Sequence, residues 1–200
     1  MKVLVACEFS GVVRDAFTAQ GHDAMSCDIL PTESPGKHYE GDVLDLIEEP
    51  FDIVIAHPPC TYLSNSGVRW LAGNPERWAK MRDAADFFHK MSTFNAPRIA
   101  IENPIQHGYA VKQHGLQRHD QLVQPWMFGH MESKATCLWL FNLPKLQETN
   151  NVKKEMNELP VGVRNRIHYA PDSKGRQKRR SVTYKGIAEA MAQQWGGLDS

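Results

Sequence analysis

Cys60 is the residue of this sequence best placed to act as a nucleophile. It ends the stretch DIVIAHPPC, whose first five residues have the apolar, β-branched pattern of a buried strand in a parallel sheet. Pro58 and Pro59 cannot donate to a ladder, so the strand ends there and the following turn is stiff. Open α/β folds bind ligands at the carboxyl edge of the sheet, and a thiol held there can form a covalent bond to a substrate. A second interpretation stays open, because most free cysteines are buried and inert.

Glu102 is expected to reach the same edge. Residues 98–101 form the next strand-like run, which ends on Glu102-Asn103-Pro104. Since neighbouring parallel strands end at one edge of a sheet, the Glu102 carboxyl group and the Cys60 thiol are predicted to face one substrate. A carboxyl group beside a nucleophile can hold or transfer a proton.

The amino-terminal residues have the pattern of a nucleotide-binding unit. A buried-strand run at 2–7 precedes Glu8-Phe9-Ser10-Gly11, and a helical stretch follows at 12–19. Gly11 permits a tight turn, and Ser10 is predicted to cap the helix. The pattern is short of a full GxGxxG, and glycine turns of this kind also serve purely structural roles.

Two acidic residues follow at positions where such folds bind a nucleoside. A second short strand, 24–27, closes on Asp28, which is about twenty residues beyond the glycine turn and so is predicted to bind a ribose. Asp42, within Gly41-Asp42-Val43, has two interpretations: it caps a short acidic helix at 44–48, or it accepts a hydrogen bond from an adenine amino group.

The remaining patterns predict one α/β domain over residues 1–200, with a mostly parallel, Rossmann-like central sheet. We expect a further strand at 136–141, an amphipathic helix at 75–91 and a closing helix at 185–195. Residues 31–37, 105–129 and 147–163 are predicted to be loop-like or exposed, and 65–74 a mobile lid over Cys60. The basic segment 164–180 is either a solvated loop or an arm that contacts phosphates.

Composition narrows the class of protein. Lys+Arg and Asp+Glu both number 23, so net charge points to no partner. The four cysteines are far apart and form no CxxC pair, which argues against a zinc site or a disulfide framework and favours a reducing cytoplasm. His114 and His119 are five residues apart and do not share a helical face, so no metal is expected. No apolar run approaches the ~20 residues of a membrane span, and we expect a soluble cytoplasmic protein.

The ordered set EFSG, Asp28, GDV, PPC, IENP and a closing helix resembles the DNA (cytosine-5) methyltransferases, in particular short forms from phages and prophages. The resemblance implies a Rossmann-like methyltransferase fold, S-adenosylmethionine as cofactor and cytosine in duplex DNA as substrate. It implies catalytic roles for Cys60 and Glu102. The cofactor contacts it implies are Glu8, Phe9, Ser10, Gly11, Asp28, Ile29, Asp42, Val43 and Pro58. The implied DNA contacts are Pro59, Ser64, Asn103, Lys134, Thr136, Lys174, Arg176, Lys178, Arg179 and Arg180.

The sequence departs from that family at four places. Pro104 stands where the family has valine, Lys134-Ala135-Thr136 replaces an Arg-x-Arg pair, and His57 replaces a small residue before Pro-Pro. About forty residues separate Phe141 from Ser181, where the family inserts a large target-recognition domain, so low sequence specificity is expected.

Three alternative functions and one assembly stay open. Amino-group methyltransferases use [DNS]PP[YFW], from which HPPC differs at both ends, and Tyr62 comes two residues too late. An enzyme that acts on free nucleotides and an inactive binding module on the same fold are the other two. A homodimer is possible.

Overall fold

The central sheet confirms the α/β class. The computed structural model describes residues 1–169 and 180–198, and these residues form one sheet with the strand order β3-β2-β1-β4-β5-β7-β6. The first five strands of this order are parallel, whereas β7 is antiparallel to both β5 and β6. The sheet is therefore mostly parallel and Rossmann-like. Its strands are β1 (Lys2–Ala6), β2 (Asp23–Asp28), β3 (His38–Glu40), β4 (Ile53–Ala56), β5 (Ile99–Asn103), β6 (Gln121–Val123) and β7 (Thr136–Phe141).

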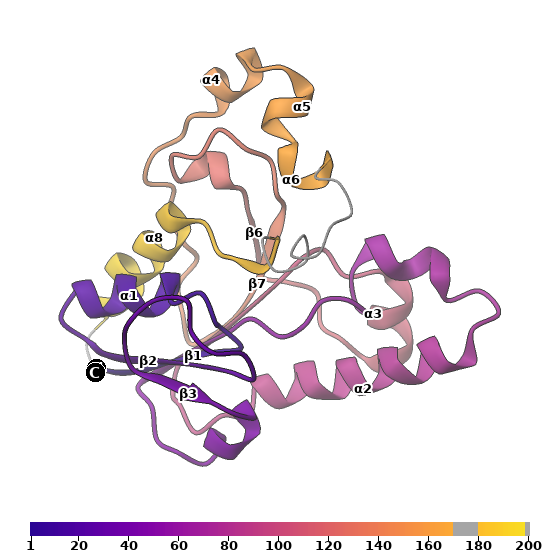
Figure 1. The fold of residues 1–200 in the computed structure, drawn as a ribbon, viewed down its shortest axis with the longest axis horizontal. Helices are drawn as coiled ribbons and strands as arrows, with labels where there is room; N and C mark the ends of the chain where they lie inside the picture. The colour runs from indigo at the N-terminus through magenta and orange to yellow at the C-terminus, as the bar shows by residue number, and fades with distance from the viewer. Residues whose placement is uncertain (170–179, 199–200) are drawn as a thin grey trace.

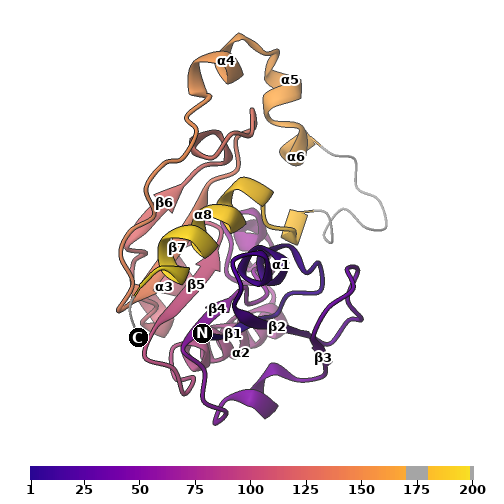
Figure 2. The ribbon, with the colours of Figure 1, turned by 90° about the vertical axis from the view of Figure 1, so that its left-hand side faces the viewer.

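Helices cover both faces of the sheet (Figures 1 and 2). Alternate residues of the central strands point to opposite faces, so Val3 and Ile53 belong to one core cluster and Leu4 and Val54 to the other. The helices are α1 (Val12–Ala19), α2 (Pro75–Met91), α3 (Gly108–His114), α4 (Lys153–Glu158), α5 (Val161–Arg164), α6 (Arg166–Tyr169) and α8 (Lys185–Gly196). Short 3₁₀ turns are η1 (Val43–Leu46), η2 (Asn65–Trp70) and η3 (Pro125–Met127).

Helices α1 and α8 lie side by side on the face to which Val3 points. Phe17 from α1 and Ile187, Met191 and Trp195 from α8 are fully or almost fully buried there. The predicted closing helix is thus confirmed, and its apolar face is what holds the carboxyl-terminal part of the chain against the sheet.

Helix α2 covers the opposite face together with α3. It starts with Asn74, whose side chain accepts from the Arg77 amide, and with Pro75 in the first turn. Met81, Phe88 and other residues at helical spacing bury against the sheet, as the amphipathic pattern predicts.

Several segments predicted as loops are folded. Residues 105–129 contain α3, β6 and η3, and residues 65–70 of the predicted lid form η2. Within 147–163, helix α4 buries Met156, which is 4% exposed, so that segment is not wholly on the surface. Figure 1 shows α4, α5 and α6 as an extension at the upper end of the molecule, beyond the sheet. Residues 170–179, which include most of the basic segment, lie outside the described residues.

Candidate active site

Cys60 follows strand β4, and Glu102 lies at the end of the neighbouring parallel strand β5. Strands β4 and β5 pair in register with Ala56 opposite Ile101, so the turn that carries Cys60 and the end of β5 that carries Glu102 emerge beside each other. The Asn103 side-chain amide donates to the carbonyl oxygen of Pro58 at 2.8 Å, and this bond is buried. The two strand ends are therefore tied together, as the sequence predicts from their common edge.

Glu102 is paired with His57. The Nδ1 atom of His57 lies 3.1 Å from Oε2 of Glu102, and the two side chains are 7% and 14% exposed. Burial by itself raises the pKa of Glu102. The hydrogen bond from His57, the charges of His57 and Lys134 and a hydrogen bond with Thr136 together outweigh burial and bring that pKa below its usual value. Glu102 is consequently a carboxylate at neutral pH.

Cys60 is half-buried and its thiol is not activated in the free protein. Burial and the nearby charge of Glu102 raise its pKa, and Arg180, a backbone hydrogen bond and Lys134 offset this only in part. The surroundings of Cys60 therefore do not favour a thiolate in this state. Because Glu102 contributes to the increase, any ligand that neutralises the carboxylate also favours the thiolate.

Lys134 fastens the chain after the basic segment to this site. Its ammonium donates to the carbonyl oxygens of Arg180, at 2.7 Å, and Val182, at 3.4 Å, and lies 5.6 Å from the centre of the Tyr184 ring. Thr136 is buried and its hydroxyl donates to the Lys134 carbonyl. Arg180 thus lies near Cys60, whereas the other predicted phosphate contacts, Lys174, Arg176, Lys178 and Arg179, fall outside the described residues.

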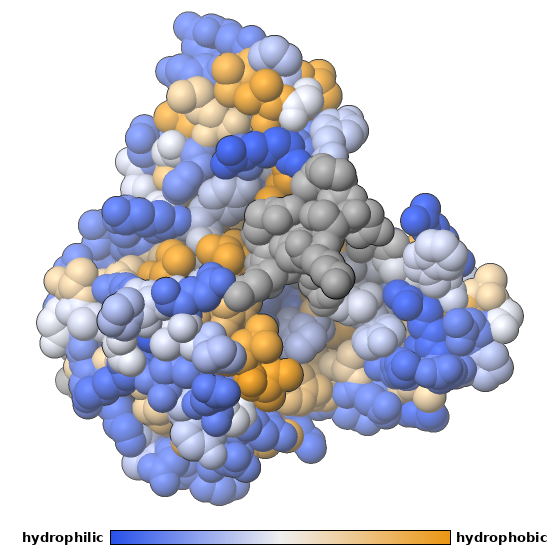
Figure 3. Space-filling view, in the orientation of Figure 1, coloured by the Kyte–Doolittle hydropathy of each residue, from blue (hydrophilic) through white to orange (hydrophobic). Residues whose placement is uncertain are grey.

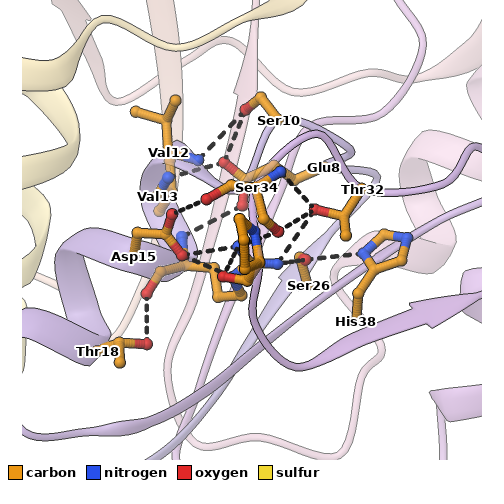
Figure 4. A network of polar contacts seen from close by, with 12 residues as sticks. Glu8, Ser10, Val12, Val13, Asp15, Thr18, Ser26, Thr32, Ser34 and His38 are labelled. Carbon is orange, nitrogen blue, oxygen red and sulfur yellow. Dashed lines mark hydrogen bonds and ion pairs between the residues drawn. The ribbon is translucent and has the colours of Figure 1, made fainter.

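The glycine turn after β1 is held by Glu8. Its buried carboxylate accepts from the backbone amides of Val13, at 2.7 Å, and Arg14, at 3.2 Å, and from the Ser10 hydroxyl (Figure 4). Gly11, with φ of 76°, precedes the helix and provides no side-chain cap. The predicted capping by Ser10 is confirmed, since its hydroxyl accepts from the Val12 amide at 3.4 Å. Glu8 adds to it, because its longer side chain reaches two further amides at the amino end of α1.

Arg14 connects this turn to the loop after β2, and the sequence analysis missed it. The side chain is 1% exposed, and its guanidinium donates to the Ser26 and Thr32 hydroxyls and to the carbonyl oxygens of Ser34 and Pro35 (Figure 4). Apart from the carboxylate of the neighbouring Asp15, to which Nε donates at 2.8 Å, these acceptors lie twelve or more residues away along the chain, so local periodicity cannot reveal them. The nearest sequence signal is the Thr- and Ser-containing, glycine-bearing loop at 31–37.

The two carboxylates predicted to bind a nucleoside, Asp28 and Asp42, lie on either side of this loop in the sequence. Asp28 Oδ1 accepts from the Leu30 amide at 2.9 Å and Asp42 Oδ1 from the Leu44 amide at 3.0 Å, so Asp42 does cap η1. Within residues 1–169 and 180–198, the Oδ2 atoms of both carboxylates accept no hydrogen bond and remain free to accept one from a ligand. The Gly41 amide donates to the Asp28 carbonyl at 3.0 Å, which holds the two turns together.

Apolar surface adjoins these carboxylates. Ile29 is 77% exposed and Leu30 44% exposed, whereas Phe9, Val43 and Pro58 are buried. Figure 3 shows hydrophobic surface beside a hollow near the middle of the face that it draws. A nucleoside needs acceptors for its hydroxyl and amino groups and an apolar surface for its base, and this combination of carboxylates and exposed Ile29 fits it.

A groove of about 400 Å³ opens beside Pro59, which is exposed on the turn before Cys60. Its walls are largely apolar, with Lys80 and Asp83 adding charge. The remaining lining residues are Tyr62, Ala84 and Phe87. Ser64, predicted to contact DNA, is buried and donates its backbone amide to the Cys60 carbonyl at 2.9 Å.

Among the described residues, no group of three or more His, Cys, Asp or Glu side chains is arranged to hold a metal ion. None of the described helices combines the length and the apolar character needed to cross a membrane.

Comparisons with known proteins give structural similarities only. No family model and no curated protein matches the sequence. A prophage-encoded E. coli protein, described as a DNA modification methyltransferase, matches 80% of this chain and 56% of its own with 16% identity and a TM-score of 0.45. An rRNA methylase from Escherichia coli matches 70% and 55% with 17% identity and a TM-score of 0.38. The 16S rRNA methylase RmtB matches 70% and 54% with 16% identity and a TM-score of 0.37. The chain spans little more than half of each of these structures, and with TM-scores below 0.5 they leave its family open.

Proposed function

We propose that this chain is an S-adenosylmethionine-dependent DNA (cytosine-5) methyltransferase of low sequence specificity. The observation that carries the proposal is the joining of Cys60 and Glu102 at adjacent strand ends through the bond from Asn103 to Pro58. The nucleophile and the carboxylate that the chemistry needs are thereby directed to one substrate.

The reaction begins with the Cys60 thiolate. Carbon 5 of cytosine is a poor nucleophile, so the thiolate adds to carbon 6, and the electron pair of the 5,6 double bond moves through carbon 4 toward ring nitrogen 3. Nitrogen 3 takes a proton from water, and Glu102 accepts hydrogen bonds from that N–H and from the adjacent amino group, which stabilises the adduct. Once carbon 5 carries the methyl group, its hydrogen is lost as a proton to water, the bond between carbon 6 and the Cys60 sulfur breaks, and nitrogen 3 loses its proton again, so the ring is restored. The same pairing partly neutralises Glu102, which removes part of the cause of the high pKa of Cys60.

The cofactor is assigned to the β1–β3 half of the edge. S-adenosylmethionine, when bound, supplies an electrophilic methyl group. Asp28 would accept from its ribose hydroxyls, Asp42 from its adenine amino group, and Ile29 would lose exposed surface against the adenine. Glu8 and Arg14 hold the two loops that carry these contacts.

DNA is the proposed macromolecular substrate. Lys134 and Arg180 bring positive charge to the edge that holds Cys60, and the basic segment that ends at Arg180 is expected to contact phosphates. The base must also leave the duplex to reach Cys60, at a cost of a few kcal/mol.

Covalent trapping tests the proposal. Duplex DNA that carries 5-fluorocytosine should form an adduct that survives denaturation in the presence of S-adenosylmethionine, because the fluorine blocks release from Cys60. Cys60→Ala should form none. The matched control is Cys137→Ala, since Cys137 also lies near Glu102 but is fully buried in β7, and it should still trap.

Two results would contradict the assignment. One is an adduct formed by the Cys60→Ala protein. The other is methylation of an exocyclic amino group without any adduct, detected by mass spectrometry of the digested nucleosides, which would favour an amino-group methyltransferase.

A further inference from the structure

His57 is a buried titratable residue to which the proposed chemistry assigns no role. It lies on the turn that carries Cys60, three residues before it, and its side chain is 7% exposed. Nδ1 is 3.1 Å from Glu102 Oε2, while Nε2 is buried without a hydrogen-bond partner among the described residues. An orphaned buried nitrogen is costly, so its retention at this point needs a reason.

The pairing with Glu102 determines which ring nitrogen carries hydrogen. Since the Glu102 carboxylate can only accept, Nδ1 of His57 must donate to it. In the neutral ring Nε2 is then without hydrogen, and it is the atom at which a further proton can bind.

We propose that His57 is a positioning residue for Glu102: its Nδ1–H bond holds Oε2 so that the rest of the carboxylate faces the target base. This inference rests on the proposed function, and it concerns a residue that departs from the family to which the sequence is similar.

Two variants test the hydrogen bond. In His57→Asn the side-chain amide can take the place of Nδ1–H, whereas His57→Leu removes the donor. The measurement is the rate of adduct formation on 5-fluorocytosine DNA by each protein at one fixed pH.

We expect His57→Asn to keep most of the wild-type rate, because its amide still holds Oε2 of Glu102. We expect His57→Leu to be about tenfold slower, the loss that one hydrogen bond to a charged group typically causes. Equal rates for the Leu and Asn variants, or a Leu variant as fast as the wild type, would overturn the proposal.

A second readout needs no activity. In protein with ¹³C-labelled glutamate carboxyl groups, the Glu102 signal, assigned with Glu102→Gln, should titrate below the ordinary value of 4.5 in the wild type. It should titrate above that value in His57→Leu, because burial then dominates, and at an intermediate pH in His57→Asn. An unshifted signal in both variants would overturn the coupling of His57 to Glu102.

The two readouts distinguish the two levels of inference. If no protein, wild type included, traps DNA while the Glu102 signal moves as expected, the proposed function fails and the pairing stands. If DNA is trapped and the signal does not move, the proposed function stands and the role of His57 is wrong. Circular dichroism of each variant shows that it is folded.

Discussion

The side-chain amide of Asn103 donates a 2.8 Å hydrogen bond to the carbonyl oxygen of Pro58, and this one bond joins the turn that carries Cys60 to the strand that carries Glu102. Asn103 is 1% exposed, and its Oδ1 has no hydrogen-bond partner among the described residues. Burial of the Asn103 amide costs free energy because its polar atoms lose water. Among the described residues, the bond to Pro58 is the interaction of these atoms that offsets this cost. The bond therefore determines how the thiol and the carboxylate face each other.

Asn103→Ala should separate the two groups. We expect the free energy of unfolding to fall by about 1–3 kcal/mol, because the Pro58 carbonyl loses its buried donor, and adduct formation to slow while cofactor affinity is kept. Urea denaturation and the trapping assay measure these effects. Asn142→Gly is the matched control: Asn142 makes the same bond to the Pro97 carbonyl, at 2.9 Å on the surface, and its φ of 53° suits glycine. Equal losses in both variants would show that the bond at Asn103 has no special role.

The apolar runs of the sequence predict most of the sheet because buried parallel strands are continuously hydrophobic. For that reason β1, β4, β5 and β7 are found where they are expected, and so is the shared edge of Cys60 and Glu102. Strands β3 and β6 were not predicted. Both have three residues, lie at opposite edges of the sheet and carry polar side chains such as His38 and Gln121, so neither shows a period.

The site was less predictable where distant segments determine it. The raised pKa of Cys60 depends on its depth of burial and on the position of Glu102, which no local pattern contains. Arginine on a short helix ordinarily indicates an exposed face. Arg14 is buried because a loop about twenty residues later supplies carbonyl and hydroxyl acceptors. Such acceptors become visible only once the chain is folded.

Arg14→Lys should weaken both the fold and cofactor binding. Lysine keeps the charge but loses the planar fork that reaches Ser26, Thr32 and the Ser34 carbonyl together. We expect a loss of stability of about 1–3 kcal/mol in urea denaturation and a higher Kd for S-adenosylmethionine by calorimetry. The control is Arg82→Lys, on the exposed face of α2, which should change neither. Retained affinity in the Arg14 variant would argue that the loop at 29–37 does not meet the cofactor.

Asp28→Ala should weaken cofactor binding directly. The ribose hydroxyls would lose their acceptor, at a cost of about 1–3 kcal/mol in binding free energy. Asp23→Ala is the matched control. Asp23 is an exposed carboxylate at the amino end of β2, and Asp28 is at the carboxyl end of the same strand. Calorimetry that finds the same affinity for both variants would count against a nucleoside at Asp28.

The pH dependence of Cys60 alkylation tests its link to Glu102. The folded protein holds the pKa of Cys60 above the ordinary 9.0, so the thiol is neutral at pH 7 and its reaction with iodoacetamide should rise with pH into a more alkaline range than for a free thiol. Glu102→Gln removes a nearby negative charge, which lowers that pKa and should speed alkylation at a fixed pH. Mass spectrometry of the Cys60 peptide gives the rate. Glu158→Gln, on the exposed side of α4, serves as control, and an identical profile for the wild type and the Glu102→Gln protein would disprove the coupling.

Sequence specificity is expected to be low. Discrimination of a base pair requires side chains in the major groove, and each good bidentate contact contributes roughly 1–3 kcal/mol. Between β7 and α8 the described chain adds only the short helices α4, α5 and α6, the last of which lies within the basic segment, and this is less than a separate recognition domain. The loop after Cys60, the segment before Trp126 and the basic segment can hold phosphates and read one or two neighbouring bases, so we predict a degenerate site of about one to three base pairs.

A dimer would present two copies of these elements and lengthen the site. Bisulfite sequencing of treated random-sequence DNA decides the matter, together with the oligomeric state in solution. Modification confined to a defined site of about four or more base pairs by a monomer would mean that the α4–α6 extension reads DNA after all.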